Sequence, residues 1–347
     1  MASYYDAPTS LRPDLRVVPL DTIWIHENCD RSRLPALLDA IGEQRVLENP
    51  VIVGSITPAG EHRFVHLDGA NRVAALRSLG CTHVAVQVVD LCHAQQVRLS
   101  TWAHLTSVDR MDFLSHLERL PEVDLRPLSS EGNATEYPAA AAFIFCRQGA
   151  YLLSLRRPTA ISRIAVLQAM VSLYSRRIER YQLPLWPEPH IVTRHLATSA
   201  SDEPDHVLIT FVPLEPSDFL ELASQGVQMP PGVTRFVLRC GRAIGINAPL
   251  SILGSDRCAA SANNWLATVR KEQPVVMPGP CRVREYLGWR DYDDDEPLLL
   301  YHGKRPGTGS MNGIFEKHSL RATSARRRLI WLLDPSSRSS AVSHLPA

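Results

Sequence analysis

Residues 63–80 combine an apolar stretch, an Asp-Gly turn and a second stretch with helical periodicity. Arg63–Leu67 is typical of a strand. Ala70–Leu79 predicts a helix that ends at Gly80, because glycine readily adopts the left-handed conformation found at such ends. The turn between them is Asp68-Gly69, where glycine lets the backbone bend sharply and approach a ligand. A strand–turn–helix unit of this kind favours a mixed α/β fold.

Short strands and helices alternate on both sides of this unit. Apolar residues within 32–44 recur at i, i+3, i+4 and i+7, which predicts a helix. We expect a strand at 83–89 and a helix at 94–105. Additional short strands are expected at 16–19, 22–26 and 50–53. This order defines a first lobe over residues 11–120 and places the chain in the α/β (α+β) class.

The composition changes at residues 121–138, which are rich in Pro, Ser, Gly and acidic residues and are the expected linker. A second mixed α/β lobe, residues 139–317, is expected beyond it. Its expected elements are a hairpin of 141–146 and 151–155, a long helix at 160–181, a strand at 207–212 and a helix at 216–224 ending before Gly226. Residues 256–280 are irregular in composition and are interpreted as an insertion. The Arg- and Ser-rich tail, 318–347, is expected to be mobile.

Charge and cysteine content exclude several classes of protein. Lys plus Arg total 37 against 36 Asp plus Glu, so a net charge of +1 favours neither nucleic acid nor an anionic membrane as a partner. No apolar run approaches the roughly 18–20 residues that span a bilayer. The seven cysteines form no Cys-x-x-Cys pair, which indicates reduced thiols in the cytoplasm. Neither a P-loop nor a Gly-x-Gly-x-x-Gly motif is present.

The turn at 67–72 has the features of an anion site. Backbone N–H groups at the start of a helix attract phosphate, and Arg72 in the first turn adds a bidentate positive charge. The carboxylate of Asp68 beside such a site can hold Mg²⁺ or orient a hydroxyl. The structural alternative is a tight turn in which Arg72 forms a salt bridge with Asp68. These six residues alone leave the two interpretations equal.

A second carboxylate stands at the end of an early strand. His26-Glu27 closes the stretch expected at 22–26, and Arg33 lies six residues further on, at the start of a helix. A carboxylate beside a phosphate pocket can take the proton from an attacking hydroxyl. For Glu27 taken alone, a solvated surface position is the commoner role.

These residues belong to a longer pattern. Its members in the first lobe are His26-Glu27, Asp30, Arg33, residues 49–53, residues 67–72, Ala75-Leu76, Leu79-Gly80, residues 86–90 and Thr101-Trp102. Its members in the second lobe are the segments P-P-G-V-T-R at 230–235, G-R-A at 241–243, N-A-P-L at 247–250 and E-P-L at 296–298. The pattern resembles that of the free L-serine kinases, whose first lobe is ParB/sulfiredoxin-like. The resemblance covers about residues 11–301, apart from 256–280.

This resemblance implies a kinase that transfers a phosphoryl group from ATP or ADP, with Mg²⁺, to the hydroxyl of free L-serine, giving O-phospho-L-serine. It implies that Glu27 is the general base and Asp68 a second acidic group and Mg²⁺ ligand. The residues implied to bind the nucleotide phosphates are Gly69, Ala70, Asn71, Arg72 and Arg33; those implied to bind the amino acid are Trp102, Thr234 and Arg235. The donor, the exact hydroxy amino acid, the oligomeric state and the pathway (cysteine, diaminopropionate or siderophore biosynthesis) stay open.

The chain departs from the family pattern at two places. Ala70 and Asn71 stand where the family often has histidine, and Phe236 follows Thr234-Arg235 where histidine is frequent. Each change removes a possible hydrogen bond to phosphate or to the amino acid.

Three other interpretations compete with the kinase. A non-catalytic regulator would keep the nucleotide fold without turnover. A ParB-like DNA-binding protein would need an arginine pair in the turn and a helix-turn-helix after the first lobe. Sulfiredoxin-like chemistry would need a cysteine in the turn, where Ala70 and Asn71 stand.

Overall fold

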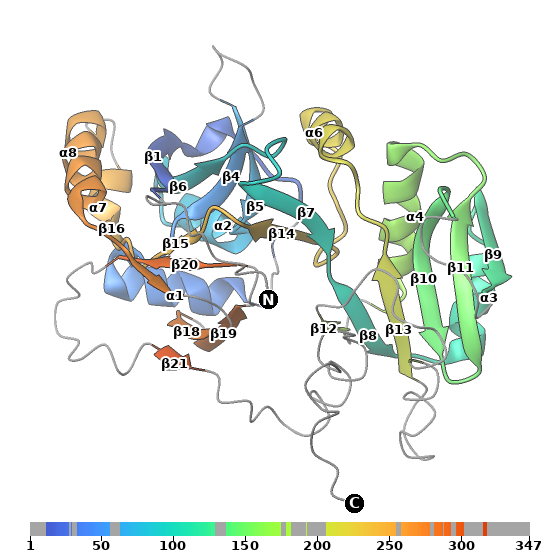
Figure 1. Ribbon diagram of the computed structural model, residues 1–347. Coiled ribbons are helices and arrows are strands. Elements are labelled where there is room, and N and C mark those ends of the chain that lie inside the picture. Colours follow the sequence, from blue (N-terminus) through green and yellow to red (C-terminus); the bar gives the residue numbers. More distant parts are fainter. Residues whose placement is uncertain are drawn as a thin grey trace, which may run out of the picture. The chain divides into compact units, whose positions relative to one another are not determined.

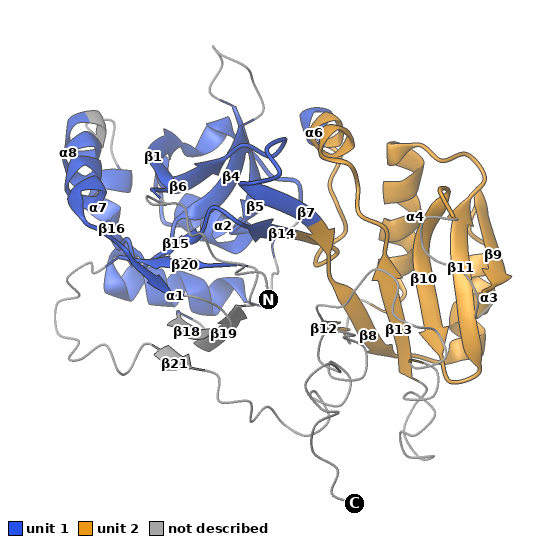
Figure 2. Cartoon of the chain, in the orientation of Figure 1, with its two compact units in different colours: residues 1–99, 223–226, 236–319 blue, residues 100–222, 227–235, 320–347 orange. Residues whose placement is uncertain are grey.

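The structure is a computed structural model in which two compact units are interleaved along the chain (Figure 2). Unit 1 comprises residues 1–99, 223–226 and 236–319, and unit 2 comprises residues 100–222, 227–235 and 320–347. The expected lobes, 11–120 and 139–317, are consecutive in sequence, so these units divide the chain differently. The residues that the structure describes are 12–27, 29, 33–55, 63–128, 137–174, 178–181, 192, 206–254, 258–277, 281–286, 288–292, 296–301 and 315–317. The tail expected to be mobile, 318–347, lies outside them.

A five-stranded mixed sheet forms the centre of unit 1, in the order β1-β6-β4-β5-β2 (Figure 1). Its strands are β1 (Asp14–Pro19), β2 (Ile23–Trp24), β4 (Val51–Ser55), β5 (Phe64–Asp68) and β6 (His83–Val89). The pairs β1–β6 and β4–β5 are antiparallel, whereas β4–β6 and β2–β5 are parallel. The strands expected at 16–19, 50–53, 63–67 and 83–89 are confirmed. The stretch expected at 22–26 is shorter, because a 3-10 turn, Leu20–Thr22, precedes β2.

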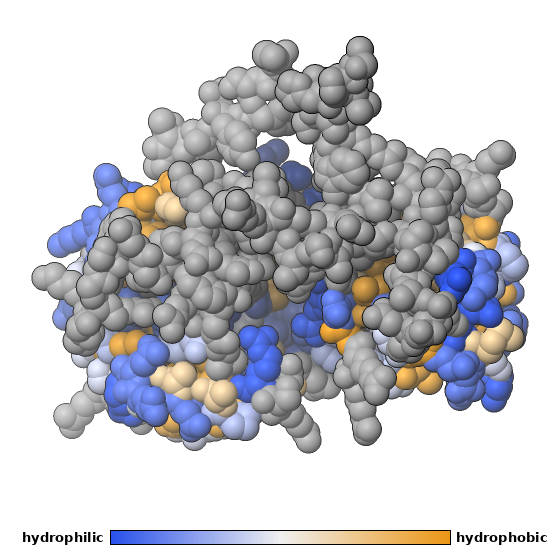
Figure 3. Space-filling view, turned by 90° about the horizontal axis from the view of Figure 1, so that it is seen from below, coloured by the Kyte–Doolittle hydropathy of each residue, from blue (hydrophilic) through white to orange (hydrophobic). Residues whose placement is uncertain are grey.

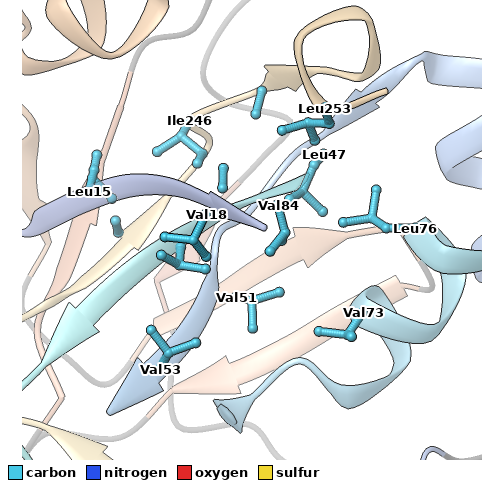
Figure 4. Packing of buried hydrophobic residues seen from close by; sticks show 14 of the residues in the cluster. Leu15, Val18, Leu47, Val51, Val53, Val73, Leu76, Val84, Ile246 and Leu253 are labelled. Atoms are coloured by element: carbon cyan, nitrogen blue, oxygen red, sulfur yellow. The ribbon is translucent and has the colours of Figure 1, made fainter. Parts of the chain in front are cut away.

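Helices cover this sheet and close its core. They are α1 (Leu34–Gln44), α2 (Ala70–Ser78), α7 (Leu250–Leu253) and α8 (Cys258–Lys271). The helices expected at 32–44 and 70–79 are confirmed, and Gly80 has a φ of 73° as its helix-ending role requires. Valines of β4 and β6 pack with Val73 and Leu76 of α2 (Figure 4). Because both faces of these central strands are buried, their sequences are mainly apolar rather than alternating, and the buried Gln87 of β6 is an exception.

The segment 256–280, interpreted from its composition as an insertion, contains the helix α8 and the strand β17 among its described residues. Its central part is α8, in which Ala262, Leu266 and Val269 lie at helical spacing and are buried. Polar residues on the other face of this helix hid the pattern.

Smaller ladders complete unit 1. One pairs β3 (Val46–Leu47) with β16 (Ala248–Pro249), and another places β20 (Leu298–Leu300) between β15 (Arg242–Ile244) and β17 (Val275–Met277). A third has the order β19-β18-β21, with bounds β18 (Cys281–Glu285), β19 (Gly288–Tyr292) and β21 (Phe315–Lys317). The second ladder brings two segments more than fifty residues apart into register, Arg242 opposite Leu298.

Unit 2 contains a six-stranded antiparallel sheet in the order β12-β8-β13-β10-β11-β9. Its strands are β8 (Ala103–Ser107), β9 (Val123–Pro127), β10 (Ala140–Cys146), β11 (Gly149–Leu155), β12 (Ile178–Tyr181) and β13 (His206–Phe211). The helices α3 (Arg110–Glu118) and α4 (Ala160–Ser172) pack on one face, in a cluster with Ile144 and Ile209. Phe143 and Phe145 point to the opposite face, as alternation along a strand requires. The predicted hairpin and the strand at 207–212 are confirmed.

The helix α6 (Pro216–Ser224) agrees with the prediction at both ends, and Gly226 has a φ of 71°. Three other expectations for this half of the chain are wrong. Residues 94–105 form no helix but β7 (Val97–Thr101) and the start of β8. The helix expected over 160–181 ends at Ser172, and Ile178–Tyr181 is β12. The expected linker contains β9, which pairs with β11. In each case pairing with a distant strand overrides local composition.

Within the described residues, no helix combines the length and the apolar character needed to cross a membrane. On the face drawn in Figure 3, the exposed described residues are mostly hydrophilic, and apolar residues appear only in small groups.

Candidate active site

The Asp68 turn joins β5 to α2. Asp68 is the last residue of β5, Gly69 is the N-cap of α2 with a φ of 114°, and Ala70, Asn71 and Arg72 form the first helical turn. Gly69 has no side chain with which to cap the helix, so the backbone of this turn presents the positive end of the helix dipole. The first intrahelical bond runs from Val73 N to Gly69 O over 3.0 Å. The predicted strand–turn–helix geometry is therefore present.

The guanidinium of Arg72 lies against this turn. Its Nη1 donates to the carbonyl oxygens of Asn49 at 3.1 Å and of Pro50 at 2.6 Å. Its Nη2 lies 3.4 Å from Oδ2 of Asp68. A Cβ placed on Gly69 would lie only 3.0 Å from the guanidinium, so glycine is also needed for this close approach. The salt bridge between Arg72 and Asp68, expected if the segment were only a tight turn, is therefore present. It keeps the positive charge of Arg72 beside the Asp68-Gly69 turn.

A second arginine, which the sequence analysis missed, binds Asp68 more closely. Nη1 of Arg242 lies 2.5 Å from Oδ2 of Asp68, and its Nε and Nη2 each contact Oε1 of Glu296 at 2.7 Å. The side chains of Arg242 and Glu296 are only 6% and 7% exposed. The available signal was the G-R-A and E-P-L segments, to which the resemblance assigned no role.

Two buried histidines stand one residue before Glu27 and two residues before Asp68. The His26 backbone N–H donates to Nδ1 of His66 at 3.1 Å, and Nδ1 of His26 donates to the carbonyl oxygen of His66. These bonds assign one tautomer to each ring: His66 carries its hydrogen on Nε2 and His26 on Nδ1. The rings stack with centroids 4.2 Å apart, and Phe236 contacts His26 edge-on at 5.6 Å. Burial lowers the pKa of His66 to about 4 and the pKa of His26 well below 6.5, so both are neutral at pH 7.

Glu27 and Asp68 follow two strands that are parallel neighbours. Trp24, the last residue of β2, is the register partner of Val65, and Asp68 is the last residue of β5. Glu27 lies three residues beyond the end of β2, and the residue before it, His26, donates its backbone N–H to Nδ1 of His66 on β5. Both acidic residues therefore lie near the same end of this strand pair. Glu27 is half-buried, whereas Arg33, the N-cap of α1, is exposed. Asp30, another member of the family pattern, lies outside the described residues.

The three residues predicted to bind the amino acid, Trp102, Thr234 and Arg235, all belong to unit 2. The Trp102 backbone N–H donates to Val233 O at 2.9 Å, and the Arg235 guanidinium lies 5.0 Å from the centre of the Trp102 ring. Arg235 is only 5% exposed. The hydroxyl oxygen of Thr234 is buried and has no hydrogen-bond partner among the described residues.

A buried histidine holds the loop before Thr234. Nε2 of His104 contacts Gly232 O at 2.7 Å, and its Nδ1 contacts the Tyr174 hydroxyl at 3.1 Å. Burial lowers the pKa of His104 to about 4, so the ring is neutral and donates one hydrogen bond while accepting the other. The residues of β14 (Thr234–Leu238) thus follow a loop with a fixed backbone.

Within the described part of the chain, no three His, Cys, Asp or Glu side chains are arranged to hold a metal ion. Asp68 is the predicted Mg²⁺ ligand, although its Oδ2 already contacts Arg242 and Arg72.

Comparisons with known proteins show which proteins this chain resembles. No family model matches the chain. The ATP-dependent L-serine kinase SbnI of Staphylococcus aureus is 27% identical over 254 residues, which cover 72% of this chain and 88% of that protein. An ATP-dependent L-serine kinase of Desulfurococcus mucosus is 29% identical over 86 residues, 25% of this chain and 32% of its own length.

Solved structures show the same fold. SbnI with a C-terminal truncation aligns with a TM-score of 0.57 at 23% identity, covering 74% of this chain and 95% of the truncated one. A free serine kinase in complex with AMP aligns with a TM-score of 0.53 at 20% identity, covering 72% of this chain and 98% of that one. The chain is similar to the ATP-dependent L-serine kinases. The expected fold class and the expected resemblance are confirmed.

Proposed function

We propose that this protein transfers the terminal phosphoryl group of ATP to the hydroxyl of free L-serine, giving O-phospho-L-serine. The observation that carries the proposal is the position of two carboxylates: Asp68 ends β5 directly before the N-terminus of α2, and Glu27 lies three residues beyond the end of β2, the parallel neighbour of β5. The match to SbnI over 88% of that protein's length supports the choice of substrate and donor.

The phosphates bind at the first turn of α2. Backbone N–H groups of Gly69, Ala70, Asn71 and Arg72 point along the helix axis, and the helix dipole favours negative charge there. Arg72 adds a full positive charge, and we also assign Arg33 to the nucleotide. Structures of a related free serine kinase hold AMP and ADP, which supports an adenine nucleotide at this site.

Glu27 is the general base in this proposal. It takes the proton of the serine hydroxyl as the serine oxygen forms its bond to phosphorus. The bond from phosphorus to the bridging oxygen breaks, ADP leaves with that oxygen, and Glu27 then releases the proton to solvent. Phosphoryl transfer depends mainly on positioning and charge neutralisation, so no covalent intermediate with the protein is needed.

Asp68 is the second acidic residue, and we assign it as the protein ligand of nucleotide-bound Mg²⁺. When bound, Mg²⁺ would neutralise charge that develops on the phosphate oxygens. Asp68 also keeps Arg72 beside the phosphates through their contact at 3.4 Å.

The amino acid binds to Trp102, Thr234 and Arg235 in this proposal. A buried arginine suits a carboxylate, since its planar fork can donate two parallel hydrogen bonds. The ring of Trp102 supports the guanidinium from one side. The buried Thr234 hydroxyl supplies one more polar contact. We place the reaction in the cytoplasm, where ATP is abundant and cysteines stay reduced.

The test measures product directly. The protein is incubated with Mg²⁺ and each pair of L-serine, L-threonine or L-homoserine with ATP or ADP, and ³¹P NMR detects a phosphomonoester. We expect L-serine with ATP to give the fastest turnover. Nucleotide binding without product from any of the six pairs would contradict the kinase and favour the regulator.

A parallel titration addresses the DNA-binding alternative. We expect no specific duplex binding, because the net charge is +1. Affinity of about 10⁻⁸ M or tighter for a defined sequence at physiological salt would contradict this expectation.

A further inference from the structure

We propose that Arg242 is a positioning residue that sets the orientation of the Asp68 carboxylate for phosphoryl transfer, with Glu296 and Gln87 as its supports. This inference rests on the proposed function, because it gives Asp68 a part in the reaction. It concerns three side chains to which the sequence pattern assigned no role.

The first support for this inference is the closeness of the contact. Nη1 of Arg242 lies 2.5 Å from Oδ2 of Asp68, closer than the 3.4 Å between Arg72 and the same oxygen. Asp68 is half-buried, with 27% of its side chain exposed, so water competes with only part of this contact. Arg242 therefore determines where the carboxylate stands.

The second support is the set of groups that hold Arg242 in turn. Oε1 of Glu296 receives two of its N–H groups, Nε and Nη2, at 2.7 Å. Because Nε and Nη2 of Arg242 bind Glu296, its Nη1 is the nitrogen that points at Asp68. The net charge of Asp68, Arg72, Arg242 and Glu296 is zero, which a partly buried cluster requires.

The third support is the backbone on both sides of Arg242. Gln87, a fully buried amide on β6, donates from Nε2 to Gly241 O at 2.7 Å and accepts from Ala243 N at 2.9 Å. The Arg242 N–H donates to Pro297 O at 2.8 Å. Three consecutive residues are thus tied to the central sheet and to the Glu296 segment, so the arginine starts from a fixed position.

The test is a double-mutant cycle on turnover. Arg242→Met keeps the length of the side chain and removes the fork. We expect kcat to fall about 10²-fold, as for a reacting group displaced by about 1 Å, while KM for ATP and for L-serine stays within about threefold. In the Asp68→Asn background, Arg242→Met should lower kcat by less than about twofold further, because its effect acts through Asp68.

Two other variants separate positioning from folding. Arg242→Lys keeps the charge but can serve only one carboxylate at a time, so we expect a kcat between those of wild type and Arg242→Met. Arg270→Met removes an arginine of unit 1 whose Nη2 donates to Leu15 O at 2.7 Å, and we expect wild-type turnover from it. Circular dichroism and thermal melting report whether each variant is folded.

The outcomes distinguish the two proposals. Wild-type protein without phosphoserine product overturns the proposed function and this inference with it. Active wild type together with additive effects of Arg242→Met and Asp68→Asn overturns the positioning role alone. If Arg242→Met does not fold, the same cycle is run with Arg242→Lys, where additivity carries the same meaning.

Discussion

The two carboxylates have different parts in the proposed reaction. Asp68 contacts Arg242 and Arg72, so its position is tied to two positive charges. We therefore assign Asp68 to organising charge around the phosphates. Glu27, which is half-buried beyond the end of β2, is the proposed general base.

Glu27→Gln tests this assignment. Glutamine keeps the size of the side chain but cannot take the proton, so we expect kcat to fall roughly 10²–10⁴-fold with ATP affinity nearly unchanged. Turnover by ³¹P NMR and calorimetric titration with ATP measure the two quantities. Glu43→Gln, on an exposed position of α1, is the control and should be silent. A fall below about tenfold in folded Glu27→Gln protein would transfer the role of base to Asp68.

The buried hydroxyl of Thr234 allows a matched comparison. Thr106 on β8 also has a buried hydroxyl without a partner among the described residues, but the sequence pattern assigns it no role. Thr234→Val should raise KM for L-serine about tenfold, the loss of one hydrogen bond, and leave KM for ATP unchanged. Thr106→Val should leave both unchanged. Steady-state kinetics measure both KM values. Equal KM values for L-serine in the two variants would contradict a role for Thr234 in binding the amino acid.

Site residues could be predicted together from the sequence only where they lie close to one another along the chain. Asp68, Gly69 and Arg72 lie within five residues, so strand, turn and helix signals place them together. Arg242 lies 174 residues from Asp68, and no local pattern indicates that they meet. His66 was not predicted either, because it is one polar residue within an apolar strand and its partner His26 lies forty residues away.

At the scale of elements, the periodicity of apolar residues predicted helices and strands correctly where those residues pack into the core. Residues 83–89 and 216–224 form the expected strand and helix because their apolar residues face the expected core. Residues 94–105 became strands because β8 lies between β12 and β13, both distant in sequence. Pairing partners of that kind cannot be read from a local window.

The turn between β5 and α2 gives a prediction at this scale. Gly69→Ala forces a left-handed φ of 114° on alanine and places its Cβ 3.0 Å from the Arg72 guanidinium, so we expect lower stability and about tenfold weaker ATP binding. Gly80→Ala, beyond the other end of α2, also has a left-handed φ, 73°, but its Cβ meets nothing within 4 Å. It should lose about 1 kcal/mol of stability with unchanged ATP binding. Urea unfolding and calorimetry separate the two effects. Equal ATP affinity in both variants would place the phosphates elsewhere.

At the scale of the whole molecule, each unit has its own core and its own buried histidines. His26 and His66 lie in unit 1, and His104 lies in unit 2. Burial lowers the pKa of His66 and of His104 to about 4, below the 6.5 of an exposed histidine. Between pH 6.5 and about 4 the unfolded chain binds protons at these rings while the native chain does not. The free energy of unfolding therefore falls as the pH falls through this window, and above it these rings have no effect.

His104→Gln isolates one such contribution. The glutamine amide can still donate to Gly232 O but does not titrate, so the variant should lose less stability than wild type between pH 6.5 and pH 4.5. The full difference for one ring corresponds to about 3 kcal/mol. Urea unfolding at pH 7.5, 6.5, 5.5 and 4.5 measures the slope. His116→Gln, an exposed histidine on α3 of the same unit, should leave the slope unchanged. If His104→Gln kept the full wild-type slope, the His104 ring would titrate alike in the native and the unfolded protein, and its pKa would not be lowered by burial.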